Sequence, residues 1–243
     1  MITTAFRSLL FWCLFMLLIP QALWVRRTAR RFPPAAGQRA GQTGKGRTLR
    51  LLAIGDSIID GVGVGTLDEA LVGQTVNGLA ERLEARIEWQ ALGKSGLNSR
   101  QVRERLLPQA AAAPVDFILV SVGVNDIIGL SSLLRWRRNI RGFVGELRKL
   151  SPDAQIAMAG IPPLEWFPAL PQPLRSVLGL RGRDFHRALR EEVAAFDGVE
   201  VVEPAFDDPV ANFAEDGFHP SASGYAICAD AVVEVLNSNR SNS

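Results

Sequence analysis

Short apolar runs alternate with amphipathic stretches along most of the chain, from residue 49 onward. Apolar runs ended by turn residues are typical of buried strands, and apolar residues three and four apart are typical of helices packed on one face. The pattern predicts strands at residues 49–55, 86–92, 115–122, 155–159 and 199–202. It predicts helices at residues 67–83, 98–107, 131–150, 174–196 and 221–236.

This strict alternation of strand and helix indicates an α/β fold. Strands that are apolar on both faces are expected in a parallel sheet covered by helices on both sides. With right-handed crossovers the result is a three-layer α/β/α sandwich on a five-stranded parallel sheet, of flavodoxin-like type. In such folds functional sites lie beyond the carboxyl ends of the strands. Candidate site residues should therefore follow strands.

A different pattern precedes this body. Residues 8–25 carry no charged side chain, and eighteen residues of helix span about 27 Å, close to the thickness of a hydrocarbon core. We expect residues 1–31 to form an N-terminal membrane anchor with a basic flank. Residues 32–48, rich in Gly and Pro, are expected to be a flexible linker, and residues 49–243 the folded domain. A cleavable signal peptide is the alternative for the leader.

Charge is distributed unevenly between the two parts. The chain has a net charge of +2, but residues 1–50 hold nine of the 27 Lys and Arg residues and no acidic one. Residues 51–243 therefore carry a net charge of −7, which argues against a nucleic-acid partner. Arg26, Arg27, Arg30 and Arg31 follow the apolar run and predict that the domain lies on the cytoplasmic side. An exported domain is the alternative if the leader is cleaved.

Composition bounds the class of protein further. An apolar content of 47% with 21% charged residues is ordinary for one globular domain. The two cysteines, Cys13 and Cys228, are too few for a disulfide framework or a cysteine-based zinc site. No spacing of His, Cys, Asp and Glu suggests a metal site, and we expect no metal and no cofactor.

Three segments combine a turn after a strand with polar side chains that can do chemistry. Gly55-Asp56-Ser57 follows the first predicted strand, and Gly123-Val124-Asn125-Asp126 follows the third. Asp216-Gly217-Phe218-His219-Pro220 lies between the last strand and the last helix. The carboxyl ends of parallel strands share one edge of the sheet, so these segments are expected to converge there.

In these three segments the chain resembles the SGNH/GDSL hydrolases, over nearly the whole body. The resemblance implies a nucleophile at Ser57 and a triad completed by Asp216 and His219. It implies an oxyanion hole made by the amide of Ser57, a glycine amide and the side chain of Asn125. The glycine block is the weakest match: Leu92-Gly93-Lys94-Ser95-Gly96 offers Gly93 or Gly96, and Gly96 is favoured because a helix start follows at Asn98.

Elementary chemistry agrees with these assignments. A serine hydroxyl attacks a carbonyl only when a base accepts its proton, and a neutral imidazole serves at neutral pH. A carboxylate on the other ring nitrogen holds the imidazole in one tautomer. Oxyanion donors stabilise the negative charge that develops on the carbonyl oxygen.

Other polar residues are given structural interpretations. His186, in a helical stretch rich in arginine, is expected to be a surface histidine, and Asp126 a helix cap without a direct role. Asp207 or Asp208 could replace Asp216 but lacks the three-residue link to His219. Residues 61–65 alternate Gly and Val, which predicts a mobile loop over the nucleophile rather than a dinucleotide site.

The proline-rich loop at residues 161–174 follows a strand and should form a wall of the substrate cleft. Such an apolar wall favours a lipid-like or short-chain acyl ester as substrate. We therefore expect a serine esterase held at a membrane. A carbohydrate acetyl esterase is the enzymatic alternative, and a non-catalytic binding module tethered to a membrane is the alternative from another class.

Overall fold

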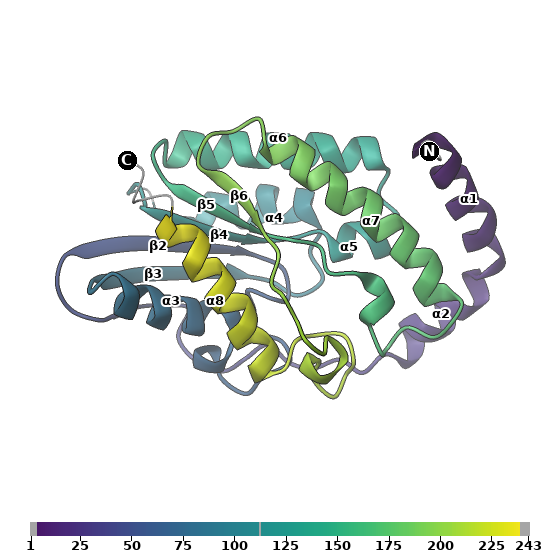
Figure 1. Ribbon diagram of the computed structural model, residues 1–243, viewed down its shortest axis with the longest axis horizontal. Helices are drawn as coiled ribbons and strands as arrows, with labels where there is room; N and C mark the ends of the chain where they lie inside the picture. Colours follow the sequence, from purple (N-terminus) through teal and green to yellow (C-terminus); the bar gives the residue numbers. More distant parts are fainter. Residues whose placement is uncertain (1–3, 112, 239–243) are drawn as a thin grey trace.

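A six-stranded sheet forms the centre of the computed structural model, which describes residues 4–111 and 113–238 (Figure 1). The strand order is β1-β3-β2-β4-β5-β6, and the last five strands are mutually parallel. This confirms the predicted α/β sandwich with a mostly parallel sheet. The strands are β1 (Ala40–Thr43), β2 (Thr48–Gly55), β3 (Arg86–Gly93), β4 (Phe117–Ser121), β5 (Gln155–Ala159) and β6 (Val199–Val202).

Helices cover both faces of the sheet. One face carries α3 (Leu71–Arg82) and α8 (Ala222–Ser238); the other carries α4 (Ser99–Arg105), α5 (Val124–Ile128), α6 (Leu133–Leu150) and α7 (Leu174–Val193). Side chains alternate along β2, where Leu51 and Ala53 join the core under α3 and α8. Leu52 and Ile54 join the core on the opposite face. Burial on both faces explains why these strands read as continuous apolar runs.

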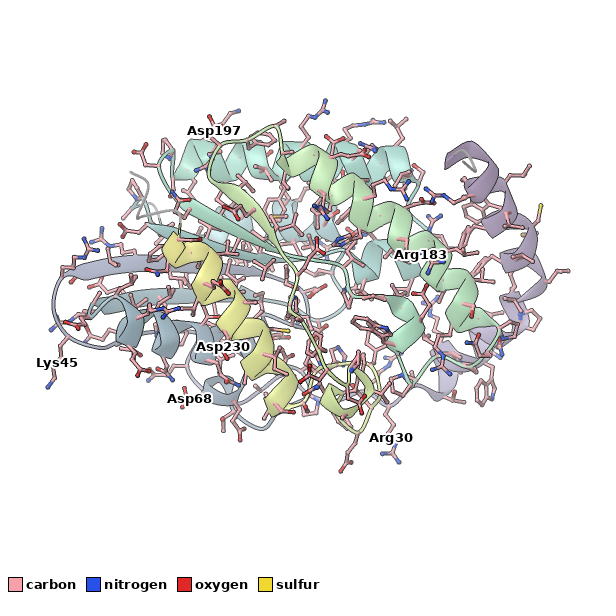
Figure 2. All side chains as sticks on the ribbon, viewed as in Figure 1. Arg30, Lys45, Asp68, Arg183, Asp197 and Asp230 are labelled. Carbon is pink, nitrogen blue, oxygen red and sulfur yellow. The ribbon has the colours of Figure 1, made fainter. Side chains whose placement is uncertain are left out.

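Charged side chains lie at the periphery of these layers. Figure 2 shows Lys45, Asp68 and Asp197 projecting outward from the ends and edges of the molecule. At the centre of the sheet, every residue of β4 is buried. The sheet therefore contributes rigidity, and chemistry is left to the segments that follow its strands.

The sequence-based expectations differ from the structure at two places. The sheet has six strands rather than five, because part of the expected linker forms β1, which pairs antiparallel with β3. β1 has the sequence Ala-Gly-Gln-Thr, without an apolar pattern, and is held by backbone hydrogen bonds at the sheet edge. The short helix α5 was also not expected, since its five residues are fewer than a periodic pattern requires.

The N-terminal leader forms two helices, α1 (Thr4–Leu17) and α2 (Ile19–Thr28). Among the described residues no single helix is long and apolar enough to cross a membrane, but Arg7–Leu17 and Ile19–Thr28, bent by 69°, reach that length and composition together. Pro20 lies in the first turn of α2, where its missing N–H is tolerated, and it interrupts a continuous helix. α1 packs against α7.

Candidate active site

Ser57 lies in a tight turn directly after β2. The amide of Asp60 donates to the carbonyl of Asp56 at 3.1 Å, and the amide of Val62 donates to the carbonyl of Ser57 at 3.0 Å. These bonds close the turn and direct the Ser57 hydroxyl toward the carboxyl edge of the sheet. Its Oγ lies 2.9 Å from Nε2 of His219, which is 162 positions further along the chain.

The segment from Asp216 to His219 is a compact turn that positions two side chains at once. Oδ1 of Asp216 accepts hydrogen bonds from the amides of Phe218 and His219, each at 2.9 Å. Its Oδ2 lies 2.6 Å from Nδ1 of His219. Gly217 has a φ of +62°, and a Cβ there would lie 2.9 Å from the amide nitrogen of Ala169. The turn therefore requires glycine at this position.

The carboxylate of Asp216 is held in its ionised form. Burial by itself would raise the pKa, but the hydrogen bonds from the His219 ring and from the amides of His219 and Phe218 lower the pKa of Asp216 below its ordinary value. An ionised carboxylate accepts a hydrogen bond from the N–H at Nδ1 of His219, which keeps the proton on that nitrogen and leaves the Nε2 lone pair facing the Ser57 hydroxyl. The arrangement can thus remove a proton from Ser57.

Asn125 is the second residue of α5, the short helix after β4, and lies beside the serine turn. Its Nδ2 donates to the carbonyl of Leu97 at 3.0 Å and, more weakly, to Oδ2 of Asp56 at 3.4 Å. The bond to Leu97 joins Asn125 to the segment after β3, which carries Gly96. Gly96 has a φ of +82° and open space around its Cα, whereas a Cβ on Gly93 would lie 2.4 Å from the amide nitrogen of Asp60.

Gly96 lies close to Asn125, because Asn125 bonds to the carbonyl of Leu97, the next residue in the chain. Gly93 instead packs against the serine turn. Ser57, Asn125 and His219 line the main cavity, and Gly96 is not among its lining residues. The roles of Gly96 and of the Ser57 amide as oxyanion donors stay predictions.

A buried carboxyl group, Asp56, connects the serine turn to Asn125. Its Oδ1 accepts from the amide of Ile58 at 3.2 Å and from Oγ of Ser121 at 3.4 Å, while Oδ2 faces Asn125. Burial raises the pKa of Asp56 to about 7, although the Ile58 amide and the charge of His219 act in the opposite direction. Sequence reasoning assigned this residue no role, because its burial depends on the neighbouring loops.

The raised pKa of Asp56 has a measurable effect on stability. The unfolded chain loses this proton near pH 4, and the folded protein keeps it to about pH 7, so stability falls by about 1.4 kcal/mol per pH unit between these values. We expect Asp56→Asn to lack this loss. As the pH rises from about 4 to about 7, the free energy of unfolding of the variant minus that of wild type should therefore increase by about 1.4 kcal/mol per pH unit.

Urea unfolding of both proteins at several pH values across this window measures the slope. Asp68→Asn, the same substitution at an exposed carboxylate, is the control. A difference between wild type and Asp56→Asn that stays constant with pH would show that Asp56 is ionised in the folded protein throughout.

Asp126, expected to be a helix cap, is fully buried. Its side chain bonds to the start of α4 and not to its own helix, α5. Its carboxylate accepts from the amide of Ser99 at 2.8 Å and from the Ser99 hydroxyl at 2.7 Å. It thereby anchors the start of α4 beneath the Asn125 segment. Burial raises the pKa of Asp126, as it does that of Asp56.

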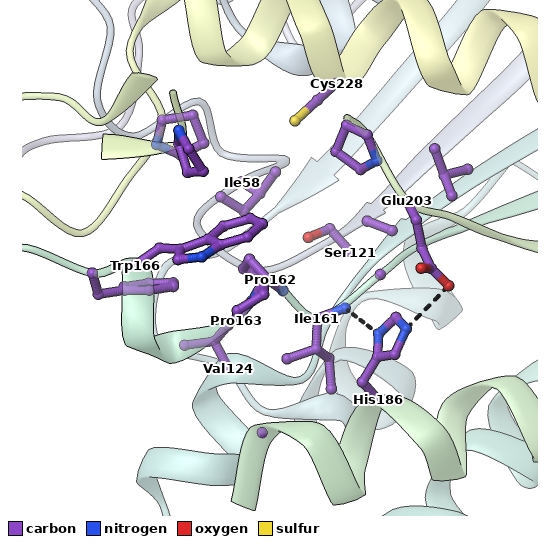
Figure 3. A pocket seen from close by; sticks show the side chains of 18 of the residues that line it. Ile58, Ser121, Val124, Ile161, Pro162, Pro163, Trp166, His186, Glu203 and Cys228 are labelled. Atoms are coloured by element: carbon purple, nitrogen blue, oxygen red, sulfur yellow. Dashed lines mark hydrogen bonds and ion pairs between the residues drawn. The ribbon is translucent and has the colours of Figure 1, made fainter. Parts of the chain in front are cut away.

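A cavity of about 690 Å³ opens beside Ser57 and His219. It runs along the carboxyl ends of the strands between α7 and α8, as Figure 3 shows for a subset of its lining residues. The predicted wall is confirmed: residues of the proline-rich loop line the cavity, among them Ile161, Pro162, Pro163, Trp166 and Phe167. Further aromatic lining comes from Phe206, Phe213 and Phe218.

His186 was expected at the surface, and that expectation is wrong. The side chain is half-buried and lines the cavity. Its Nδ1 accepts from the amide of Ile161 at 3.2 Å, and its Nε2 lies 3.1 Å from Oε1 of Glu203 (Figure 3). Helical periodicity placed His186 on a polar face, but only the folded chain shows that the loop after β5 crosses this face. His186 connects α7 to the cavity wall.

Two other features near the site, Cys228 and Gly63, escaped sequence reasoning. Cys228, on α8, points its sulfur toward the cavity in Figure 3, and burial raises the pKa of its thiol to about 12. Gly63, in the loop predicted to be mobile, lies against the His219 segment: a Cβ there would approach the Pro220 carbonyl to 2.4 Å.

Across residues 4–111 and 113–238, no group of three His, Cys, Asp or Glu side chains could hold a metal ion.

The fold and the grouping of Ser57, His219 and Asp216 at the sheet edge define an acylhydrolase-like protein. Residues 53–227 match the model of the GDSL-like lipase/acylhydrolase family, and the chain belongs to this family. It is 30% identical over 195 residues to a GDSL-like esterase of Mycobacterium tuberculosis. The match includes 77% of this chain and only 62% of the length of that relative.

Solved structures support the same fold. A lipase from a goat rumen metagenome superposes with a TM-score of 0.65 at 18% identity, over 77% of this chain and 97% of that one. An acetylxylan esterase from Geobacillus stearothermophilus superposes with a TM-score of 0.58 at 23% identity, over 80% of this chain and 95% of that one. At these identities the likeness shows the fold alone.

Proposed function

We propose that the protein hydrolyses carboxylic esters with Ser57 as nucleophile, His219 as general base and acid, and Asp216 as the group that orients His219. The main support is a continuous series of two contacts. Ser57 Oγ lies 2.9 Å from His219 Nε2, and His219 Nδ1 lies 2.6 Å from Oδ2 of Asp216. Family membership and the adjacent cavity support the proposal.

The reaction follows from this geometry. Ser57 Oγ bonds to the ester carbonyl carbon while its proton passes to Nε2 of His219. When the tetrahedral intermediate collapses, the bond to the alcohol oxygen breaks and His219 returns the proton to that oxygen. A water molecule then attacks the acyl-serine ester with His219 again as base, which releases the acid and restores the Ser57 hydroxyl.

Asn125 is proposed as one oxyanion donor, together with the amides of Ser57 and Gly96. Of the two contacts made by Asn125 Nδ2, the 3.4 Å contact to Asp56 is the weaker, so this N–H is the one that can turn to a substrate oxygen. The stronger bond to Leu97 keeps the side chain in place. Loss of one such donor typically raises the barrier by about 2.7–4 kcal/mol.

The cavity favours an apolar acyl group as the substrate. Its proline and aromatic lining excludes water from a hydrocarbon chain, and its size far exceeds that of an acetyl group. Each buried methylene contributes about 0.8 kcal/mol, so the two additional methylenes of a butyryl group should raise kcat/KM about tenfold over acetyl. Kinetics with p-nitrophenyl acetate, butyrate and octanoate measure this.

Trp166→Ala removes part of the wall and should reduce the preference for butyrate, whereas Leu134→Ala, at an exposed position away from the cavity lining, should retain it. A protein that prefers acetylated sugars and gains nothing from longer chains would be a carbohydrate acetyl esterase instead. A protein without turnover on any of these esters, and without labelling of Ser57 by a fluorophosphonate, would be a binding module.

The leader is proposed to attach the protein to the cytoplasmic face of a membrane. Its support is the apolar composition of the bent pair α1–α2 together with the four arginines at and after the end of α2, since the cytoplasmic leaflet is negatively charged.

A further inference from the structure

The outward face of the helix pair α1–α2 is strongly apolar. Leu17 is 78% exposed, Met16 63% and Leu9 62%, and on α2 the exposed fraction of Trp24 is 59%. Leu10, Trp12 and Leu23 are exposed beside them. Seven large apolar side chains on two consecutive helices exceed what scattered surface residues explain, so this face is expected to bind an apolar partner.

The opposite face of α1 is packed into the domain. Phe11 and Phe15 are buried in the core that contains α6 and α7, and their rings stack 5.3 Å apart. The guanidinium of Arg181, on α7, lies 4.6 Å from the centre of the Phe11 ring. Arg7, on α1, forms an ion pair with Asp184, which lies on α7. α1 therefore has an inner face specific for α7 and a separate outer face.

α2 is bonded to the loops that border the cavity. The side chain of Gln21 donates to the Gln172 carbonyl at 2.9 Å and accepts from the amide of Leu174 at 3.2 Å. Beyond the end of α2, Arg30 lies 4.0 Å from Glu215, the residue before Asp216. These contacts fix the direction in which the outer face points relative to the catalytic turn.

Over its described residues, neither helix alone is long enough to cross a bilayer. α1 has 14 residues and α2 has 10, so they extend about 21 Å and 15 Å, against a hydrocarbon core of about 30 Å. The 69° bend prevents them from acting as one straight span while α1 stays packed on α7. A helix with one apolar and one partnered face is suited to lie in the plane of a bilayer surface.

The positive charge next to the outer face favours an anionic lipid surface as the partner. Arg26, Arg27, Arg30 and Arg31 are all exposed at the end of α2 and directly after it. Basic residues beside an apolar helix face are attracted to anionic lipid headgroups. Residues 51–243 carry a net charge of −7, so the net charge of the domain does not add to this attraction.

We infer that α1–α2 is an in-plane docking surface for an anionic lipid bilayer, held on the domain by α7, rather than a membrane-spanning anchor. The outer apolar side chains enter the interface between headgroups and acyl chains, and the arginines contact the headgroups. The inference rests on the proposed membrane attachment and is independent of the proposed catalytic residues.

Flotation of the full chain with lipid vesicles tests the surface. The partition coefficient should be at least about tenfold higher on vesicles of phosphatidylglycerol and phosphatidylcholine in equal parts than on phosphatidylcholine alone. The double variant Met16→Glu, Leu17→Glu should lose about tenfold or more of this binding. Both side chains are exposed, so the variant should keep its fold, which circular dichroism checks.

Arg82→Gln with Arg86→Gln is the matched control, because it changes the net charge by the same amount at exposed positions remote from α1. We expect its partition to stay within about twofold of wild type, since charges far from the bilayer are screened. Equal losses for the two double variants would mean that overall charge alone drives binding, and would overturn the docking surface.

Alkaline carbonate extraction distinguishes the two membrane geometries. We expect carbonate to release the protein from vesicles, as for a peripheral helix pair. Binding that resists carbonate would show a span and overturn the in-plane geometry alone. Absence of binding to either kind of vesicle would overturn membrane attachment itself. A concentration-dependent dimer that becomes monomeric in the variant Met16→Glu, Leu17→Glu would overturn it too, because a second copy of the chain would then cover this face.

Discussion

Ser57→Ala is expected to lower kcat for p-nitrophenyl butyrate on the order of 10⁵–10⁶-fold, because it removes the hydroxyl proposed to form the acyl intermediate. The Ser57 hydroxyl lies 2.9 Å from Nε2 of His219 and beside the apolar cavity. Alanine removes only the hydroxyl, so the fold and the affinity for the ester should be retained. Steady-state kinetics, with circular dichroism as a check of folding, measure the effect.

Ser223→Ala is the matched control, since Ser223 lies exposed on α8 and bonds only to neighbouring polar groups. A fluorophosphonate should label wild type and Ser223→Ala and fail to label Ser57→Ala. If Ser57→Ala kept more than about one hundredth of the wild-type kcat, the nucleophile would be another group and the mechanism proposed above would be wrong.

Asp216→Asn is expected to lower kcat about 10⁴-fold while preserving the geometry of the turn. The asparagine oxygen can still accept from the amides of Phe218 and His219, as Oδ1 of Asp216 does. Its amide nitrogen would instead donate to Nδ1 of His219. The imidazole would then carry its proton on Nε2, which could no longer accept the proton of Ser57.

The control is Asp208→Asn, at the acidic residue that the sequence left open as an alternative. Asp208 is exposed and caps the short turn at Val210–Asn212, so its substitution should leave kcat within about twofold. A larger loss for Asp208→Asn than for Asp216→Asn would reverse the assignment. Equal and small losses for both would mean that His219 needs no carboxylate partner.

The sheet and its carboxyl edge could be predicted because they depend on local patterns. Strands buried on both faces must be apolar along their length, and β5 and β6 are found at the predicted residues. The three polar segments follow strands, and parallel strands end at one edge, so their convergence required no knowledge of side-chain positions. The link between Asp216 and His219 is likewise local, since three residues on one turn cannot separate far.

Other features depend on partners that are distant in the chain. Ala40–Thr43 forms a strand because β3 offers a free edge, and its own residues carry no strand pattern. His186 lines the cavity because the loop after β5 crosses α7. The raised pKa of Asp56 arises from its burial beside Ser121, at the end of β4, and Asn125, in α5. None of these neighbours is visible in the local sequence.

The leader shows both limits together. Its apolar composition predicts a membrane anchor, and its arginines predict that the domain lies on the cytoplasmic side. Both stay predictions. The assignment of faces was not predictable, because Phe11 and Met16 are equally apolar and only α7 determines which is buried. The sequence by itself thus determined the order of elements, the polar segments at the sheet edge and the apolar and basic composition of the leader. Tertiary structure alone decided burial, the cavity and the docked geometry, because each arises where segments far apart in the chain remove one another from water.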